Sequence, residues 1–536
     1  MKHTDIIRKL NLEQKCALLS GETVFTTRAL PGRGIPSITL SDGPNGVRKQ
    51  AGAADHLGLN PSVPATCFPT SSATACSWDE ALGEAIGEAM GEEAAAQEVA
   101  VLLGPGLNIQ RSPLCGRDFE YFSEDPILAG KMAAAYVRGI QKNGIAACPK
   151  HFAVNSQELR RMASNSVVDE RTLRELYLTG FEIVVKEARP KTIMTSYNLI
   201  NGTYANENAH LLQDILRKDW GFDGAVVTDW GGSNDHALGV KNGSTLEMPC
   251  PGGDSIRELM KAVKDGKVTE ADLDARLDEL LELVLSTHAA VEKAPRTFDA
   301  AAHHTLARRA AAESIVLLKN EDGILPLKAG EKLAVIGDFA QTPRYQGAGS
   351  SAVNALQVDA LLDCIKADDR GISFVGYASG FDRQGAADPK KQEEAVSLAK
   401  QADTVLLCLG LDELRESEGL DRADMALAEN QQQLLEAVAA VNPNVVVLLS
   451  AGAPVETPWA GRCKALVYGA LGGQAGAGAA ADILTGKLCP CGKLSQTWAK
   501  AHDDTPAKAN FGGEGRNVEY REGLYVGYRY YQTAGV

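Results

Sequence analysis

The stretch Ala225-Val226-Val227-Thr228-Asp229-Trp230-Gly231 decides the fold of the first half of the chain. Four apolar or β-branched residues precede a carboxylate, and a tryptophan and a glycine follow it. Such a run is typical of a buried parallel strand that ends in a polar turn. Similar short apolar runs occur at 38–40, 100–103, 145–147, 192–194 and 245–247. Amphipathic helical patterns separate them, so residues 1–290 are predicted to form a (β/α)8-type barrel.

Polar residues follow each of these predicted strands. In such a barrel the carboxyl ends of the strands form the rim where active sites lie. A polar turn explains any single residue about as well as function does, but it explains the whole set much less well. The set is Asp42, Asn108, Arg111, Lys150, His151, Tyr197 and Asp229.

A second α/β unit follows a proline-containing segment. Residues 291–303 are predicted to be a linker. Alternation then resumes, with strands expected at 333–336, 374–375, 405–407, 445–449 and 465–468. This pattern favours an open α/β sandwich domain over 304–510. The glycine-rich and then aromatic tail, 511–536, is expected to pack back on the domains.

Composition excludes several classes of partner. The net charge is −15, and no block of Lys and Arg stands out, which argues against nucleic acid and anionic membranes. No run of about 18 apolar residues is present, so no membrane span is predicted. The charged first ten residues lack an apolar signal core, which favours a cytoplasmic location.

Metal and cofactor chemistry finds no support in the sequence. The eleven cysteines are scattered, mostly in apolar runs, and are expected to be small buried hydrophobes. Cys489 and Cys491 form a close pair without neighbouring histidines, and no HExxH motif occurs. The glycine-rich stretches 347–351 and 473–478 lack the features of phosphate-binding loops. We therefore expect neither a metal nor a cofactor.

Two carboxyl groups are what glycosidic hydrolysis requires. Asp229 at a strand end beside Trp230 would place a carboxylate next to a ring on which a sugar can stack, although an Asp that begins a turn is equally common. Lys150 and His151 would be costly to bury unless they meet polar groups. Sugar hydroxyls or an internal salt bridge would both supply such groups. Arg161 could join this cluster or lie on a solvated helix.

Several longer stretches together resemble glycoside hydrolase family 3, the β-glucosidase group. The resemblance follows the chain in order over nearly its whole length. In the first half the matching stretches are Ser41–Arg48, Gly104–Arg111, Gly116–Pro126, Cys148–Phe152, Thr195–Asn198 and Val226–Gly231. In the second half they are Ala312–Asn320, Gly347–Ser350, Glu418–Arg422 and Gly523–Arg529.

The resemblance implies a role for individual residues. Asp229 looks like the nucleophile, and Glu418 looks like the acid/base on a loop of the second domain, with Glu416 as the rival. Glu418 would then need a raised pKa. The residues expected to bind the hydroxyls of the sugar are Asp42, Arg111, Lys150, His151 and Arg161; Met194, Tyr197 and Trp230 are expected as walls, and Ser350 as a hydrogen-bonding residue from the second domain.

The chain departs from the family pattern in three places. The segment Lys150–Ser156 lacks the second histidine of the hexosaminidase branch, and Leu420 stands where tyrosine is usual. The family pattern continues with a closing segment and a fibronectin-like domain, which are expected to be absent after Val536. The resulting hypothesis is a retaining, exo-acting β-glucosidase that acts on β-glucosides or short β-gluco-oligosaccharides. A homo-oligomer is the assembly that this hypothesis leaves open. The alternatives are a β-xylosidase or mixed-specificity β-glycosidase, a non-hydrolytic sugar-binding protein, and a glycoside phosphorylase.

Overall fold

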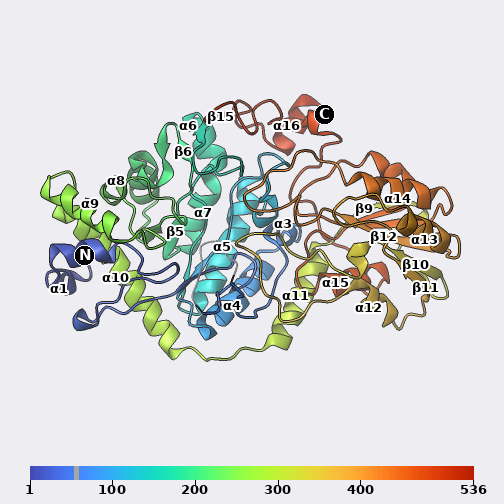
Figure 1. Ribbon diagram of the computed structural model, residues 1–536, viewed down its shortest axis with the longest axis horizontal. Helices are drawn as coiled ribbons and strands as arrows, with labels where there is room; N and C mark the ends of the chain where they lie inside the picture. The colour runs from blue at the N-terminus through green and yellow to red at the C-terminus, as the bar shows by residue number, and fades with distance from the viewer. Residues whose placement is uncertain (53–59) are drawn as a thin grey trace.

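The computed structural model describes residues 1–52 and 60–536, which fold into two lobes (Figure 1). The first lobe is built on short parallel strands. One group contains β1 (Leu40–Asp42), β2 (Val101–Leu103) and β3 (Ala146–Ala147), and a second group pairs β5 (Thr192–Met194) with β8 (Ala225–Val227). The predicted strands at these places are present: β5 and β8 coincide with the apolar runs, β2 and β3 are one residue shorter, and β1 is shifted by two residues.

Isolated parallel bridges continue these strands around a barrel. Phe152 pairs with Thr195 and so joins the two groups, while Val227 pairs with Leu246. Glu247 in turn pairs with Ser20 near the start of the chain. The run 245–247 thus contributes bridges rather than a regular strand. Strands β6 (Leu199–Ile200) and β7 (Thr203–Tyr204), of two residues each, form an antiparallel hairpin that does not belong to these barrel strands.

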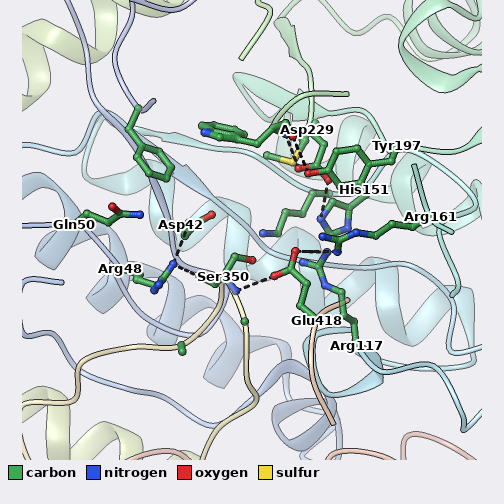
Figure 2. Close-up of a pocket in the computed structure, with 16 residues that line it drawn as sticks. Asp42, Arg48, Gln50, Arg117, His151, Arg161, Tyr197, Asp229, Ser350 and Glu418 are labelled. Atoms are coloured by element: carbon green, nitrogen blue, oxygen red, sulfur yellow. Dashed lines mark hydrogen bonds and ion pairs between the residues drawn. The ribbon is translucent and has the colours of Figure 1, made fainter. Parts of the chain in front are cut away.

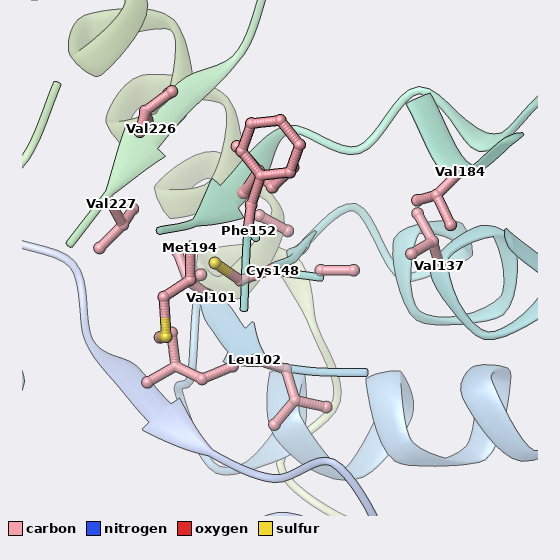
Figure 3. Packing of buried hydrophobic residues seen from close by; sticks show 14 of the residues in the cluster. Val101, Leu102, Val137, Cys148, Phe152, Val184, Met194, Val226 and Val227 are labelled. Atoms are coloured by element: carbon pink, nitrogen blue, oxygen red, sulfur yellow. The ribbon is translucent and has the colours of Figure 1, made fainter. Parts of the chain in front are cut away.

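Apolar side chains from the strands fill the barrel, as Figure 3 shows for Val101, Phe152, Met194 and Val226, all 2% exposed or less. Helices cover the outside. The main ones are α4 (Glu80–Ala96), α5 (Pro126–Lys142), α7 (Thr179–Ala188), α9 (Gly253–Lys264) and α10 (Glu270–Lys293); shorter ones are α1 (Thr4–Ile7), α2 (Leu12–Leu18), α3 (Ser71–Ala75), α6 (Glu170–Thr172) and α8 (His236–Asn242).

Close helix packing in this lobe depends on a glycine. A Cβ on Gly87 of α4 would lie 2.4 Å from the carbonyl oxygen of Tyr136 of α5. Helix α4 begins where it does because the Asp79 side chain accepts hydrogen bonds from the N–H groups of Ala81 and Leu82.

The second lobe contains a six-stranded sheet in the order β11-β10-β12-β13-β14-β9. Five strands are parallel and β9 is an antiparallel edge strand. The strands are β9 (Val316–Asn320), β10 (Lys332–Ile336), β11 (Ser373–Ala378), β12 (Thr404–Gly410), β13 (Val445–Ser450) and β14 (Ala465–Tyr468); the helices are α11 (Ala300–Ser314), α12 (Leu361–Lys366), α13 (Pro389–Ala399), α14 (Glu429–Ala439) and α15 (Gly476–Leu484). The predicted fold class, a barrel followed by an open α/β sandwich, is confirmed. Strand β9 was not among the predicted strands.

Residues 294–299 connect α10 to α11, inside the predicted linker. The domain bounds at 290 and 510 stay predictions. The tail returns to the barrel, where β15 (Asn517–Glu519) pairs in parallel with β4 (Asn165–Val167) before α16 (Tyr528–Ala534) (Figure 1). Within the described ranges, no helix is both long and apolar enough to cross a membrane.

Candidate active site

A cavity of ≈ 570 Å³ lies where loops of the second lobe meet the barrel rim (Figure 2). Both lobes contribute to its lining. The barrel supplies Phe25, Asp42, Arg48, Gln50, Arg117, Lys150, His151, Arg161, Met194, Tyr197, Asp229 and Trp230, and the second lobe supplies Gly349, Ser350, Ala352 and Glu418.

Asp229 lies two residues beyond the end of β8 and is buried. Its Oδ1 accepts a hydrogen bond of 2.8 Å from the Trp230 N–H. Its Oδ2 has no hydrogen-bond partner among the described residues, and His151 Nε2 lies 3.7 Å away. Burial raises the pKa of Asp229, whereas Arg117 and the other cations of the cavity oppose this shift. The arrangement leaves one carboxylate oxygen available to react.

Glu418 reaches the cavity from the loop between β12 and α14. Its Oε2 accepts a 2.8 Å hydrogen bond from the Ser350 N–H, and its Oε1 accepts one of 2.9 Å from Arg161 Nη1. Arg117 Nη1 lies 3.4 Å from Oε1. Burial alone would raise the pKa of Glu418, but the two guanidinium groups and the Ser350 N–H together hold it well below its usual range. The expected raised pKa is therefore not found, because two cations face the carboxylate.

The approach of Glu418 to Ser350 requires a glycine at position 349. Gly349 has φ +117°, and a Cβ there would lie 2.4 Å from the Glu418 Cβ. Any side chain would both strain the backbone and push the two loops apart.

The rival Glu416 lies elsewhere. It is 1% exposed, and both its carboxylate oxygens accept from the Gly452 N–H, at 2.8 and 3.0 Å. Glu416 is not among the described residues that line the cavity. Of the two candidates, the structure brings Glu418 to Asp229's cavity.

A buried carboxylate organises the cationic wall of the cavity. Glu120 contacts Arg117 through two hydrogen bonds, of 2.7 and 2.9 Å, and lies 3.2 Å from Lys150 Nζ. His151 Nδ1 lies 3.1 Å from the Tyr121 hydroxyl. Burial, followed by the nearby cations, lowers the pKa of His151, so this ring is neutral. The wall offers donors whose positions are fixed before a ligand binds.

Asp42 ends β1 and lies on the side of the cavity away from Arg161 (Figure 2). Its Oδ2 is 3.6 Å from Arg48 Nη1. Burial raises the pKa of Asp42 to about 6, and Lys150 and Arg48 limit the shift. A carboxylate here can accept hydrogen bonds from hydroxyl groups distant from Asp229.

Aromatic rings form the apolar wall. Trp230 packs against Phe25 with ring centroids 5.3 Å apart. The Tyr197 hydroxyl donates a 3.0 Å hydrogen bond to the Trp230 carbonyl, and Arg161 lies 5.1 Å from the centre of the Tyr197 ring. Met194 is buried beside them. Such surfaces suit the C–H faces of a sugar ring.

Arg111 is not at the cavity, contrary to the prediction. Its guanidinium contacts the Glu522 carboxylate, donates 2.9 Å to the Glu519 carbonyl and lies 3.8 Å from the centre of the Tyr520 ring. Both charged side chains are almost fully buried. Arg111 therefore holds the C-terminal tail on the barrel, because the tail supplies the carboxylate that compensates for burial of the guanidinium.

Arg117 and Arg48 line the cavity but were missed as site residues. Both lie in stretches that carry the family resemblance, Gly116–Pro126 and Ser41–Arg48, and this was the available signal. Arg111, which ends the matching stretch Gly104–Arg111 and follows a predicted strand, was selected instead. Among the described residues, no group of three or more His, Cys, Asp and Glu could hold a metal ion.

Two family models match the chain: the glycosyl hydrolase family 3 N terminal domain over residues 53–283, and the family 3 C-terminal domain over residues 315–528. The chain belongs to glycoside hydrolase family 3. This family 3 chain is 46% identical over 534 residues to thermostable beta-glucosidase B of Acetivibrio thermocellus. The aligned region covers 99% of this chain and 70% of that protein. The chain is 45% identical over 541 residues to an exo-alpha-(1->6)-L-arabinopyranosidase of Bifidobacterium breve, covering 99% and 71%.

Solved structures agree with this placement. A family 3 beta-glucosidase of Bifidobacterium adolescentis superposes with a TM-score of 0.93 at 43% identity, covering 99% of this chain and 76% of that one. Beta-glucosidase 3B of Thermotoga neapolitana in complex with glucose gives a TM-score of 0.91 at 33% identity, covering 100% and 81%. The chain is thus a family 3 glycoside hydrolase with β-glucosidases among its relatives.

Proposed function

We propose that this glycoside hydrolase is a retaining, exo-acting β-glucosidase that removes terminal β-D-glucosyl residues. One observation carries the proposal: Asp229 and Glu418, from different lobes, line a single cavity together with fixed cations and an aromatic wall. Paired carboxyl groups are the machinery of glycoside hydrolysis, and in the retaining mechanism one of them attacks the anomeric carbon.

In the first step an Asp229 oxygen attacks the anomeric carbon while the bond from that carbon to the aglycone oxygen breaks. Glu418 gives its proton to the leaving oxygen. In the structure Arg117 and Arg161 favour the ionised form of Glu418 and hold its pKa low. A sugar that excludes water and engages these cations weakens their hold, which raises the pKa of Glu418 in the complex.

In the second step Glu418 removes a proton from water. The water oxygen bonds to the anomeric carbon, and the ester bond to Asp229 breaks. The charge of Asp229 is absent from the glycosyl-enzyme, so Glu418 ionises more readily at this stage. Configuration at the anomeric carbon is retained because it inverts twice.

Azide tests both assignments. Asp229→Ala and Glu418→Ala are assayed on 4-nitrophenyl β-glucoside with and without azide, and the products are identified. We expect azide to restore turnover of Glu418→Ala with β-glucosyl azide as the product, because azide then attacks the glycosyl-enzyme. Asp229→Ala forms no glycosyl-enzyme, so any product that it gives with azide should be the inverted α-glucosyl azide. A Glu418→Ala variant with full activity, or formation of α-glucosyl azide by it, would contradict the proposal.

An α-L-arabinopyranoside is the second candidate substrate, because a relative of that activity is 45% identical, nearly as similar as the β-glucosidase. The two sugars differ in the hydroxyl and hydroxymethyl groups distant from the anomeric carbon, which is where Asp42 would contact them. Values of kcat/KM on nitrophenyl β-glucoside, β-xyloside and α-L-arabinopyranoside decide between them. We expect the glucoside to be the best substrate, and a higher value for either pentoside would change the assignment.

A further inference from the structure

The loop that carries Glu418 has little regular structure of its own. Between β12 and α14, its backbone is tied to the second lobe by the Glu418 N–H, which donates 3.0 Å to the Ala348 carbonyl. Glu418 must nevertheless be held precisely, because a displacement of about 1 Å at a reacting group can cost on the order of 10²-fold in rate. Contacts to the barrel supply the missing restraint.

We propose that Asp421 is a positioning residue that fastens this loop to the barrel and thereby sets the place of the Glu418 carboxyl. The inference rests on the proposed function, in which Glu418 is the acid/base. Asp421 touches neither substrate nor Glu418; it acts through the backbone of the loop, three residues further on.

The Asp421 carboxylate binds three backbone N–H groups of two barrel loops. Oδ1 accepts from Gly116 at 3.1 Å and from Glu158 at 2.9 Å. Oδ2 accepts from Glu158 at 3.0 Å and from Leu159 at 2.8 Å. Both oxygens are therefore committed to the barrel, and a carboxylate with three N–H donors has one preferred orientation.

A carboxylate of the barrel, Glu158, binds the backbone of the loop in the same way. Glu158 Oε2 accepts a 2.7 Å hydrogen bond from the Gly419 N–H, immediately after Glu418. The same oxygen accepts 2.7 Å from Arg161 Nη1, which also donates to Glu418. Each lobe thus contributes one carboxylate that binds the backbone of the other, and both contacts lie within three residues after the acid/base.

The backbones at this junction are in direct contact. A Cβ on Gly116 would lie 1.7 Å from the Leu420 carbonyl oxygen and 2.5 Å from that of Ser417. Arg422, the residue after Asp421, donates a 2.8 Å hydrogen bond from its N–H to the Leu114 carbonyl of the barrel. The loop therefore lies on the barrel with no space to slide, and Asp421 is at the centre of the contact.

The experiment compares a glycoside that needs acid catalysis with one that does not. Phenyl β-glucoside releases a basic leaving group, which requires a proton from Glu418, whereas 2,4-dinitrophenyl β-glucoside releases a stable anion. We expect Asp421→Asn to lower kcat/KM on the phenyl glucoside about 10²-fold, and on the dinitrophenyl glucoside less than about threefold. We also expect azide to raise kcat of Asp421→Asn on the dinitrophenyl glucoside, because azide needs no base, and to leave the wild type unchanged.

Asp424→Asn is the matched control, with the same chemical change on the same loop. Asp424 is exposed and interacts locally, accepting from the Ala426 N–H at 2.9 Å and lying 3.6 Å from Arg415. We expect both substrates to be turned over by it as by the wild type. Gly116→Ala is a second variant for the case that Asp421→Asn does not fold; it lifts the loop with Asp421 intact and should give the same dependence on the leaving group.

Equal losses on both substrates, or no loss on either, would overturn the inference. Glu418→Ala, measured beside these variants, keeps it distinct from the proposed function. If Glu418→Ala loses as much activity on the dinitrophenyl glucoside as on the phenyl glucoside, the acid/base assignment fails. If Glu418→Ala shows the dependence and folded Asp421→Asn does not, only the positioning role of Asp421 fails.

Discussion

The two halves of the active site are built in different ways. Asp229 follows β8, a strand with buried residues only, which pairs with β5 inside the barrel. Glu418 lies on a loop that accepts hydrogen bonds from Ser350 and Arg161 and donates one, from the Gly419 N–H, to the Glu158 carboxylate of the barrel. A strand fixes a side chain through local geometry, whereas a loop does so through partners distant in the sequence.

The two neighbouring arginines repeat this contrast. Arg111 and Arg117 are six residues apart, both buried, and each pairs with a carboxylate. Arg117 pairs with Glu120, three residues away, and faces the cavity, whereas Arg111 pairs with Glu522 of the tail. Two similar residues of one segment therefore lie in different surroundings, one at the cavity and one under the C-terminal tail.

The largest expected effect separates the nucleophile from the acid/base. Asp229→Ala should lower kcat/KM by about 10⁴-fold or more on every β-glucoside, because no leaving group removes the need for a nucleophile. Glu418→Ala should lower it by about 10²- to 10⁴-fold on phenyl β-glucoside and far less on the dinitrophenyl glucoside. A plot of log kcat/KM against the pKa of the leaving group measures this. Parallel plots for the two variants would show that the two halves do not have these different roles.

A paired substitution tests the two arginines. Arg117→Gln should lower kcat/KM by about 10²-fold, since it removes a cation that faces the cavity. Arg111→Gln should keep KM and kcat within about threefold, but should lower the free energy of unfolding by about 3 kcal/mol because Glu522 stays buried without its partner. Steady-state kinetics and denaturant unfolding provide the measurements. The assignment is wrong if Arg111→Gln, while folded, raises KM for the glucoside tenfold.

A smaller effect is expected from the titration of Asp42. Its pKa is raised to about 6 by burial, so the carboxyl gains a proton as pH falls through about 6. Sugar hydroxyls donate to the ionised form, and binding should therefore weaken below that pH, by up to about tenfold per unit. The inhibition constant of glucose between pH 4.5 and 8 checks this. In Asp42→Asn the inhibition constant should no longer change with pH in this range. If it still does, another group causes the pH dependence.

The smallest effect on activity is expected at Glu416. Glu416→Gln should change kcat/KM less than about threefold, because this side chain binds the Gly452 N–H rather than lining the cavity. It should lower the free energy of unfolding by about 1–3 kcal/mol, since a buried acceptor for that N–H is weakened. Kinetics and thermal unfolding measured together decide the point. A dependence on the leaving group like that of Glu418→Ala would exchange the roles of the two glutamates.

The fold was accessible to sequence reasoning wherever apolar runs alternate with helical patterns. The strands near 101–103, 192–194 and 225–227 and the parallel strands of the second lobe were found in this way. Strand β9 was missed because it is a half-buried edge strand with an antiparallel partner, β14, far along the chain. The candidate site was accessible through residues at strand ends, such as Asp42, Lys150 and Asp229, and through family motifs for Glu418.

By itself, the sequence determined which residues end buried strands, and hence that Asp229 lies at a barrel rim with Lys150 and His151. It also placed Glu416 and Glu418 on one loop. The tertiary structure was needed to show which of these glutamates faces the cavity, that Arg117 rather than Arg111 does so, and that two guanidinium groups hold the pKa of Glu418 low. The physical reason is the distance along the chain over which each property is set. Strand geometry and apolar alternation depend on neighbouring residues. The direction of a buried side chain and the charge around it depend on groups that are distant in the sequence, such as Glu158, Ser350 and Glu522, and folding brings these near.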